Sequence, residues 1–325
     1  MAVNLAVKVG TLLLKNPVML ASGCCGYALE MGEFFDLSLL GGYCLKGLCA
    51  GGSEGNPPPR LCETPGGLIN SIGLQNIGIE EFLREKAPKL RRVNSVMVAN
   101  FYGHSVEEYA AAAEKLQAEP CIAALEMNIS CPNVKTGGIA FGTDPKLVHE
   151  VTAACRKATR KPLWVKLTPN VTDITETARA AEAGGADALS CINTYPAMAI
   201  DVEKRAFKIN TRSGGLSGPA IKPLAVRAVH LVSKAVKIPV VGIGGISTWA
   251  DAVEFMLAGA AAVQVGTALF SNPNAPLEIL KGMEEYCIRH GFKDVADLVG
   301  AARDFERPDC NLPSAVIVTG EKVRK

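Results

Sequence analysis

The sequence lacks the features that would direct it into a membrane or onto a polyanion. No run of 18 apolar residues occurs in its 325 residues, so no segment is predicted to span a bilayer. Its 34 basic and 32 acidic residues leave a net charge of +2, which gives no electrostatic reason to expect a nucleic-acid or membrane partner. The N-terminal stretch MAVNLAVKVG has neither the charged region nor the cleavage site of a signal peptide, so we expect a cytoplasmic protein.

The sequence also lacks the residue spacings of metal sites. It contains 11 cysteines but no Cys-x-x-Cys pair, which disfavours an iron–sulfur or structural zinc site in this chain. Its four histidines are scattered. An odd number of cysteines, many of them in apolar surroundings, is typical of reduced, partly buried thiols in a cytosolic protein. No metal site is therefore predicted.

Short apolar runs alternate with helical patterns along the chain. The runs are apolar almost throughout, which is typical of parallel strands covered on both faces. Eight such runs predict a (β/α)8 TIM barrel, a fold that takes about 250 residues before insertions. The rival is a doubly wound sheet, which is disfavoured because no G-x-G-x-x-G follows a first strand. The predicted strands are residues 18–21, 43–46, 96–101, 125–129, 163–167, 188–192, 240–243 and 262–265.

Helix signals fall between these strands. Asp144 before a proline and Asp173 three residues before an acidic residue are N-cap patterns, and Ser247 or Thr248 is expected to open another helix that ends at Gly259. No change in composition marks a second domain. We therefore expect residues 1–325 to form one domain, with extra segments at the barrel mouth (50–74 and 194–223) and a C-terminal extension (303–325).

The last two predicted strands are followed by glycine-rich turns. Gly244-Gly245 follows one strand and Gly266-Thr267 follows the other. Glycines let a phosphate approach backbone N–H groups closely, and barrels commonly bind phosphate at these two loops. A tight turn explains either loop alone equally well, but the two loops together predict a phosphate site.

Other predicted strands end in polar side chains. Lys46 and Lys166 close two apolar runs and Asn100 closes a third. Each lysine alone is explained equally well by solvation, since it either meets an anion or extends to water. The string from Asn128 to Asn133 adds amides and the thiol of Cys131, for which a buried structural cysteine remains an equal alternative. The predicted strand ends carry no carboxylate pair, which argues against glycoside hydrolysis. Together these groups suit a phosphorylated cofactor with a planar ring and a small anionic substrate.

Four longer strings of the sequence are characteristic of one family. They are Asn128-Ile-Ser-Cys-Pro-Asn-Val-Lys135, Phe141-Gly-Thr-Asp-Pro145, Val165-Lys-Leu-Thr-Pro-Asn-Val-Thr-Asp173 and Gly214-Gly-Leu-Ser-Gly-Pro-Ala-Ile-Lys-Pro223. With them the chain resembles the class 1 dihydroorotate dehydrogenases, and most closely the catalytic subunit of class 1B. The likeness runs from Val3 to about Ala302 and keeps the family's order and spacing. Asn-Ile-Ser-Cys-Pro-Asn is very specific, whereas the glycine turns are shared with many flavin barrels.

The resemblance implies a barrel that binds FMN and oxidises dihydroorotate to orotate in pyrimidine biosynthesis. Cys131 matches the family's catalytic base, which removes the C5 proton while a hydride leaves C6 for the flavin, and Lys46 serves both substrate and flavin. The implied FMN contacts are Ser22, Lys46, Gly47, Asn100, Asn128, Lys166, Ile192, Gly218, Gly244, Gly245, Gly266 and Thr267. The implied substrate contacts are Lys46, Asn70, Ser71, Ile72, Gly73, Leu74, Asn128, Asn133, Asn193 and Thr194.

The resemblance to class 1B also implies partners. Such enzymes form a homodimer of barrels and a heterotetramer with a subunit that carries FAD and an iron–sulfur cluster and passes electrons to NAD⁺. Three alternatives remain: a class 1A barrel that reduces fumarate, a barrel like that of dihydropyrimidine dehydrogenase, and a non-catalytic flavin barrel. The last is disfavoured because Cys131, Lys46 and Lys166 are all present.

Two positions depart from the family pattern. Gly47 follows Lys46 where a small hydroxyl residue or alanine is usual, and Phe101-Tyr102 follows Asn100 where small residues are commoner. Larger groups there are expected to alter the flavin environment. The loop 134–142 is rich in glycine and is expected to act as a lid over Cys131.

Overall fold

The computed structural model describes residues 2–129 and 141–302, and its centre is a closed barrel of eight parallel strands. The strands follow one another around the barrel in the order β10-β15-β16-β3-β4-β7-β8-β9. The predicted fold class and all eight predicted barrel strands are confirmed, with bounds that differ by at most three residues. The strands are β3 (Val18–Leu20), β4 (Gly42–Cys44), β7 (Val96–Phe101), β8 (Ile122–Asn128), β9 (Leu163–Lys166), β10 (Ala188–Cys191), β15 (Val240–Ile243) and β16 (Ala260–Val265).

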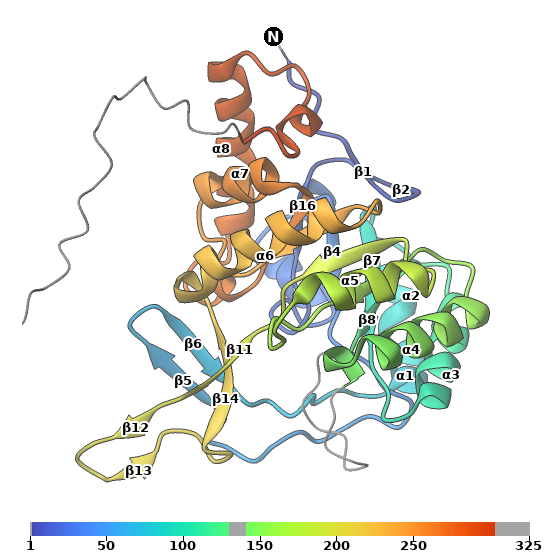
Figure 1. Ribbon diagram of the computed structural model, residues 1–325, viewed down its shortest axis with the longest axis vertical. Helices are drawn as coiled ribbons and strands as arrows, with labels where there is room; N and C mark the ends of the chain where they lie inside the picture. The colour runs from blue at the N-terminus through green and yellow to red at the C-terminus, as the bar shows by residue number, and fades with distance from the viewer. Residues whose placement is uncertain (1, 130–140, 303–325) are drawn as a thin grey trace, which may run out of the picture.

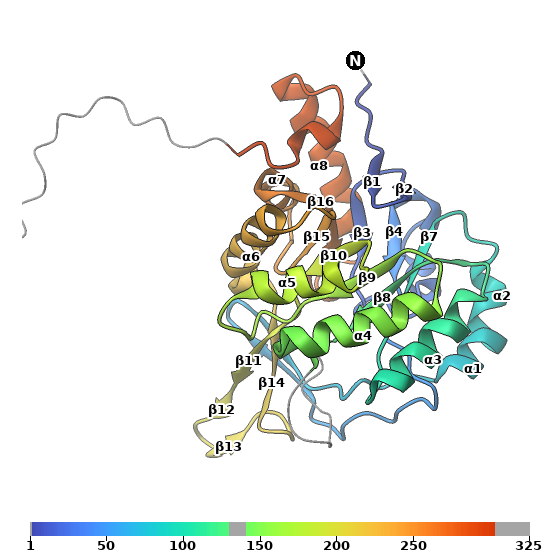
Figure 2. The same cartoon turned by 45° about the vertical axis from the view of Figure 1, so that its right-hand side comes forward.

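Helices surround this barrel (Figures 1 and 2) and cover its outer face. Strands β4, β9, β10 and β15 are buried at every position, because one face points into the barrel and the other lies under the helices. The long helices are α3 (Val106–Gln117), α4 (Pro145–Ala158), α5 (Ile174–Ala183), α6 (Lys222–Ala235), α7 (Trp249–Ala258) and α8 (Ala275–His290). Short turns of helix are α1 (Ile79–Glu81), η3 (Phe82–Lys86), α2 (Ala87–Leu90), η1 (Leu29–Glu33), η2 (Leu37–Leu39), η4 (Phe141–Thr143), η5 (Pro219–Ile221), η6 (Thr267–Phe270) and η7 (Val295–Leu298).

The helix boundaries follow the predicted caps. The Asp144 carboxylate accepts from the N–H of Lys146 at 2.8 Å, and Asp173 caps α5 in the same way. Thr248, rather than Ser247, opens α7 through a reciprocal capping box with Asp251. Each cap pairs N–H groups that the first helical turn leaves unbonded, so the helices begin where short polar side chains precede an apolar face.

The two extra segments expected at the barrel mouth form a sheet together. Strands β5 (Leu61–Thr64) and β6 (Gly67–Asn70) come from the first segment, and β11 (Tyr195–Met198) and β14 (Ser213–Ser217) come from the second. They pair antiparallel in the order β11-β14-β6-β5. Figure 1 shows this sheet projecting from the barrel, with the hairpin of β12 (Ile200–Asp201) and β13 (Ala206–Phe207) beyond it.

The N-terminal hairpin lies at the other end of the barrel. It consists of β1 (Val7–Val9) and β2 (Leu12–Leu14), and Val9 and Leu14 are fully buried. Its turn at Gly10 packs against the backbone of Asp187, immediately before β10 begins. The hairpin therefore covers the end of the barrel at which the strands begin. The strands finish at the opposite end, the barrel mouth, where the four-stranded sheet β11-β14-β6-β5 lies.

Candidate active site

Each of the eight barrel strands carries a predicted site residue at its last or next-to-last position, or is followed by one within two residues. All eight strands are parallel and form one closed barrel, so their carboxyl ends meet at a single mouth. Loops at this mouth carry the active site in barrel enzymes. In chain order the groups are Ser22 after β3, Lys46 after β4, Asn100 in β7, Asn128 at the end of β8, Lys166 at the end of β9, Ile192 and Asn193 after β10, Gly244-Gly245 after β15 and Gly266-Thr267 after β16.

Two lysines face the same part of this mouth. The Lys166 Nζ lies 3.2 Å from the Ser22 Oγ, and its side chain is almost completely buried. Burial lowers the pKa of Lys46. Burial raises the pKa of the Cys24 thiol, and the charges of Lys166 and Lys46 oppose that rise. Because both ammonium groups act on one thiol, the mouth concentrates positive charge where an anion would enter.

Amide side chains lie beside these lysines. The Asn193 Nδ2 is 3.5 Å from the Asn128 Oδ1, so residues from β8 and from the loop after β10 meet. The Tyr109 hydroxyl donates to the Asn128 carbonyl at 2.7 Å and fixes the end of β8. The N–H of Thr194 donates to the Asn193 Oδ1 at 2.8 Å, which orients that amide. Oriented amides of this kind recognise the edge of a heterocycle, because each offers donors and an acceptor.

The loop from Asn70 to Leu74 is joined to the mouth from two sides. The Asn70 Nδ2 donates to the Gly215 carbonyl at 3.2 Å, across the β6–β14 pair. The Leu74 carbonyl accepts from the Tyr102 hydroxyl at 3.3 Å. The Ser71 Oγ is buried and has no hydrogen-bond partner among the described residues. Ile72 and Gly73 lie between these anchors.

Phe101 is fully buried and Tyr102 nearly so. These two large side chains, which stand where small residues are commoner in the family, therefore pack inside the protein. Tyr102 accepts from the Asn76 Nδ2 at 2.9 Å besides donating to Leu74, and thus supports the Asn70–Leu74 loop. Gly47 packs against the neighbouring Asn100, since a Cβ there would lie 2.7 Å from the Asn100 Oδ1. The missing side chain lets that amide approach the backbone.

The glycine turns also converge. A Cβ on Gly245 would lie 2.7 Å from the Gly218 carbonyl oxygen, and one on Gly218 would lie 3.5 Å from the Thr267 methyl group. The Thr267 hydroxyl donates to the Ser217 Oγ at 2.8 Å. Gly218, Gly244 and Gly245 all have φ between +74° and +129°, a region that favours glycine. Loops after β14, β15 and β16 therefore present bare backbone at one place.

Ile192 and Gly266 complete the described predicted contacts. The Ile192 side chain is buried, and its N–H donates to the Ile243 carbonyl at 3.0 Å. A Cβ on Gly266 would lie 3.3 Å from the Cys24 Sγ, which brings the last barrel strand beside the loop after the first. Cys131 and Asn133 lie outside the described residues, as does most of the expected lid.

Sequence reasoning missed Glu126, which the barrel encloses completely. It lies two residues before Asn128 on β8, so the two side chains point to the same side of the strand. A charged residue inside an apolar run and in phase with the predicted site amide Asn128 is the signal that would have identified it. Its oxygens accept hydrogen bonds from Cys44, Asn100, Ser190 and Gln264.

Other expectations concern metals, thiols and membranes. No cluster of three metal-ligating side chains occurs among the described residues. The nine described cysteines are all free thiols, as predicted. Among residues 2–129 and 141–302, no helix has the length and apolar character needed to cross a bilayer.

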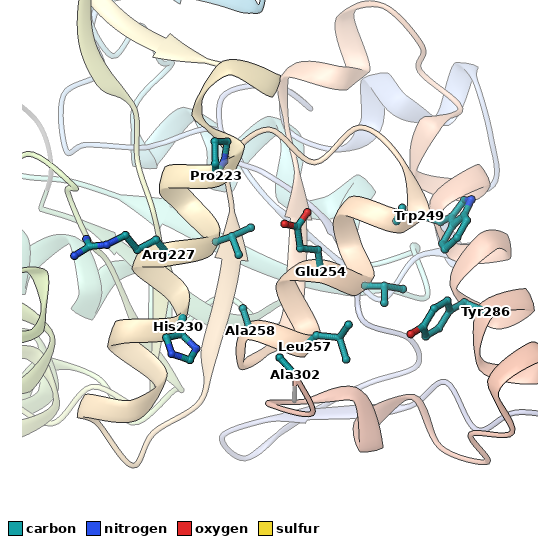
Figure 3. Close-up of a pocket in the computed structure, with 12 residues that line it drawn as sticks. Pro223, Arg227, His230, Trp249, Glu254, Leu257, Ala258, Tyr286 and Ala302 are labelled. Atoms are coloured by element: carbon teal, nitrogen blue, oxygen red, sulfur yellow. The ribbon is translucent and has the colours of Figure 1, made fainter. Parts of the chain in front are cut away.

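A pocket of about 680 Å³ lies away from these strand ends, on the outer surface of helices α6, α7 and α8 (Figure 3). Its lining is mainly apolar, with Val226, Val253 and Leu257 on its walls and Trp249 and Tyr286 on one side. It brings together none of the predicted site residues. The mouth, rather than this pocket, is therefore the candidate active site.

Comparisons with known proteins point to one family. A family model described as dihydroorotate dehydrogenase matches residues 4–287. A protein of Trichlorobacter lovleyi named dihydroorotate dehydrogenase B (NAD(+)), catalytic subunit, is 56% identical over 297 residues, which cover 91% of this chain and 98% of that protein. A protein of Geotalea uraniireducens with the same name is 55% identical over 92% of this chain and 98% of its own length.

A solved structure has the same fold at lower identity. The crystal structure of DHODH from Eimeria tenella in complex with ferulenol superposes with a TM-score of 0.77 and 21% identity. The match covers 92% of this chain and 88% of the other. At that identity the likeness supports the barrel fold alone.

Proposed function

The chain belongs to the dihydroorotate dehydrogenase family, and on that premise we propose that it oxidises (S)-dihydroorotate to orotate with FMN in de novo pyrimidine biosynthesis. The observation that carries the proposal is the meeting of Lys46, Lys166 and the Asn128–Asn193 amides at one mouth. Dihydroorotate is a small anion with amide edges, so cations and oriented amides suit it. The 56% identical relative over 98% of its length supports the same substrate.

The residues at the mouth fit FMN. The converging glycines bring bare backbone together where a Cβ would overlap neighbouring atoms, and their N–H groups suit a phosphate. Lys166 and Ser22 provide cationic and hydroxyl donors for the ring system. We propose that the FMN phosphate is held by Gly244, Gly245, Gly266 and Thr267. The remainder of the FMN molecule is held by Ser22, Lys46, Gly47, Asn100, Asn128, Lys166, Ile192 and Gly218.

The side chains divide the work of the reaction. FMN, when bound, supplies the acceptor for the hydride that leaves C6. The Cys131 thiolate takes the C5 proton, so the C5–C6 single bond becomes the double bond of orotate. Lys46 binds the substrate carboxylate, and Asn70, Asn128, Asn133 and Asn193 orient the ring, together with Ser71, Ile72, Gly73, Leu74 and Thr194. Lys166 stabilises negative charge gained by the ring system.

Electrons leave through a partner in this proposal. The relatives named as NAD(+)-linked catalytic subunits support a separate electron-transfer subunit for this chain too. We propose a homodimer of single-domain barrels (1–325) in the cytoplasm, joined in a heterotetramer by a subunit with FAD and an iron–sulfur cluster.

The test is an anaerobic reduction of the FMN-loaded chain, followed by flavin absorbance. Dihydroorotate should bleach the oxidised band promptly, and Cys131→Ser should slow that bleaching by about a hundredfold to ten-thousandfold. Cys121→Ser is the matched control, because Cys121 precedes β8 at the end opposite the mouth. Reduction by dihydrouracil but not by dihydroorotate would contradict the substrate. Turnover with fumarate by a chain that never co-purifies with a second subunit would contradict the class 1B partner.

A further inference from the structure

Glu126 is a fully buried carboxylate that gathers hydrogen bonds from across the barrel. It lies on β8, and each of its oxygens accepts two hydrogen bonds. A buried carboxylate is tolerated only when donors or a cation compensate the water it has lost. The donors are the Cys44 Sγ at 3.0 Å, the Asn100 Nδ2 at 2.7 Å, the Ser190 Oγ at 2.6 Å and the Gln264 Nε2 at 2.9 Å.

Lys166 supplies the compensating charge. Its Nζ lies 3.9 Å from the Glu126 Oε1 and 3.2 Å from the Ser22 Oγ. Burial alone would raise the pKa of Glu126, but the Lys166 charge and the hydrogen-bond donors outweigh burial, so the pKa lies below its ordinary value. Glu126 is thus an anion held directly beneath the lysine that faces the mouth.

This pairing changes the charge that the mouth presents to a cofactor. The Lys166 side chain is 7% exposed and that of Glu126 is not exposed, so little water screens the two charges from each other. The electrostatic potentials of the Lys166 ammonium and the Glu126 carboxylate therefore partly cancel at any point in the mouth. A ring system that becomes an anion on reduction is therefore stabilised less than it would be by an unpaired lysine.

We propose that Glu126 is a positioning residue that acts through Lys166 to limit how strongly the mouth stabilises reduced, anionic FMN. The proposal rests on the proposed function only in taking FMN as the cofactor. Its consequence is directional: with the Glu126 carboxylate present, bound flavin is harder to reduce and easier to reoxidise by the next electron carrier. Loss of that negative charge favours the reduced form.

The variant Glu126→Gln removes the charge while keeping nearly the same shape. The introduced amide brings a donor beside Gln264, which itself donates to Glu126. However, the Gln264 Oε1 is buried and unpaired among the described residues. If the Gln264 side-chain amide turns by half a turn, its Oε1 accepts from the amide donor introduced at position 126, and its Nε2 takes the unpaired position. The number of unpaired buried atoms is then unchanged, so the barrel should still fold.

The measurement is the midpoint potential of bound FMN, obtained by anaerobic photoreduction against a reference dye, together with the FMN dissociation constant. Glu126→Gln should increase the preference for reduced over oxidised FMN by about tenfold or more. For a two-electron couple, this is a rise of about 30 mV or more. Photoreduction needs no substrate, so the outcome does not depend on dihydroorotate oxidation.

Two controls separate charge from structure. Glu119→Gln removes another buried carboxylate, which pairs with Arg91 at the opposite end of β8, and it should leave the potential unchanged. Ser190→Ala removes a donor to Glu126 but keeps the carboxylate, and it should shift the potential far less than Glu126→Gln.

An unchanged or lowered potential in Glu126→Gln would overturn the proposal, as would equal shifts in Glu126→Gln and Ser190→Ala. If FMN binds and shows the expected shift but dihydroorotate does not reduce it, only the proposed substrate fails. If the wild-type chain does not bind FMN, both proposals fail.

Discussion

Replacing Gly245 by alanine should weaken FMN binding more than it weakens the fold. Gly245 has φ +74°, and a Cβ at this position would lie 2.7 Å from the Gly218 carbonyl oxygen and 2.9 Å from the Lys222 Cβ. Ordinary contacts begin at 3.4 Å, so the loops after β14 and β15 must separate by about 0.7 Å. The loop after β15 is one of the two that we propose for the flavin phosphate, and Gly218 in the loop after β14 is a further proposed FMN contact.

The magnitude has two parts. Alanine in the left-handed region costs about 1–2 kcal/mol relative to the right-handed one, and this penalty acts on folding. A displacement approaching 1 Å at a site that positions a ligand can change its function about a hundredfold. We therefore expect the FMN dissociation constant to rise about 10- to 100-fold, or about 1.4–2.8 kcal/mol.

Gly291→Ala provides the matched control. Gly291 has φ +77° and ends α8 on the outside of the barrel, and apart from its chain neighbours no atom of the described residues lies within 4 Å of the position that a Cβ would take there. Urea unfolding of the apoprotein should show a loss from backbone strain in both variants. Titration of FMN by fluorescence quenching should show weaker binding in Gly245→Ala alone. Unchanged FMN affinity in Gly245→Ala would refute the assignment of this loop to the phosphate.

Three further predictions concern stability and the geometry of the mouth. Two hydrogen bonds from Arg91 lower the pKa of Glu119 from 4.5 to about 2, so the ion pair contributes fully above pH 4.5 and its contribution is lost as the pH falls towards 2. Glu119→Gln should lower the free energy of unfolding by about 1–2 kcal/mol at pH 7, after allowance for the half-exposed arginine, and should flatten the acid limb of a stability–pH curve. Tyr109→Phe removes a 2.7 Å hydrogen bond to the Asn128 carbonyl, so the free energy of unfolding in urea should fall by about 1–3 kcal/mol. The same variant should raise KM for dihydroorotate. An unchanged KM would mean that the end of β8 needs no such anchor. Thr248→Ala should lower the melting temperature through the loss of about 1 kcal/mol of capping energy, without changing FMN affinity.

The barrel could be predicted from the sequence because each strand is a local, nearly continuous apolar run. Helix starts were equally accessible, since Asp144, Asp173 and Thr248 act within two or three residues of their own positions. The closed barrel then follows from the count of strands and their common direction. The candidate site residues were then found by asking which polar or glycine residues follow each predicted strand, because parallel strands finish at the same mouth.

The remaining features depend on contacts that local patterns do not encode. The sheet at the barrel mouth pairs β6 with β14, and the sequence did not predict this pairing because neither strand is continuously apolar. The Glu126 network joins side chains from several strands that are adjacent only after the barrel closes. Tyr102 supports the Asn70–Leu74 loop, a role that becomes apparent only from its hydrogen bond across the mouth.

The pairing of β6 with β14 also has a consequence for the order in which the molecule can be assembled during synthesis. Asn70 pairs with Gly215, which is made 145 residues later. At ribosomal rates of about 5–20 residues per second, β6 waits roughly 7–30 seconds for its partner strand. Until then the nascent chain holds an unpaired strand edge beside an open barrel, so the mouth is among the last parts of this molecule to become complete.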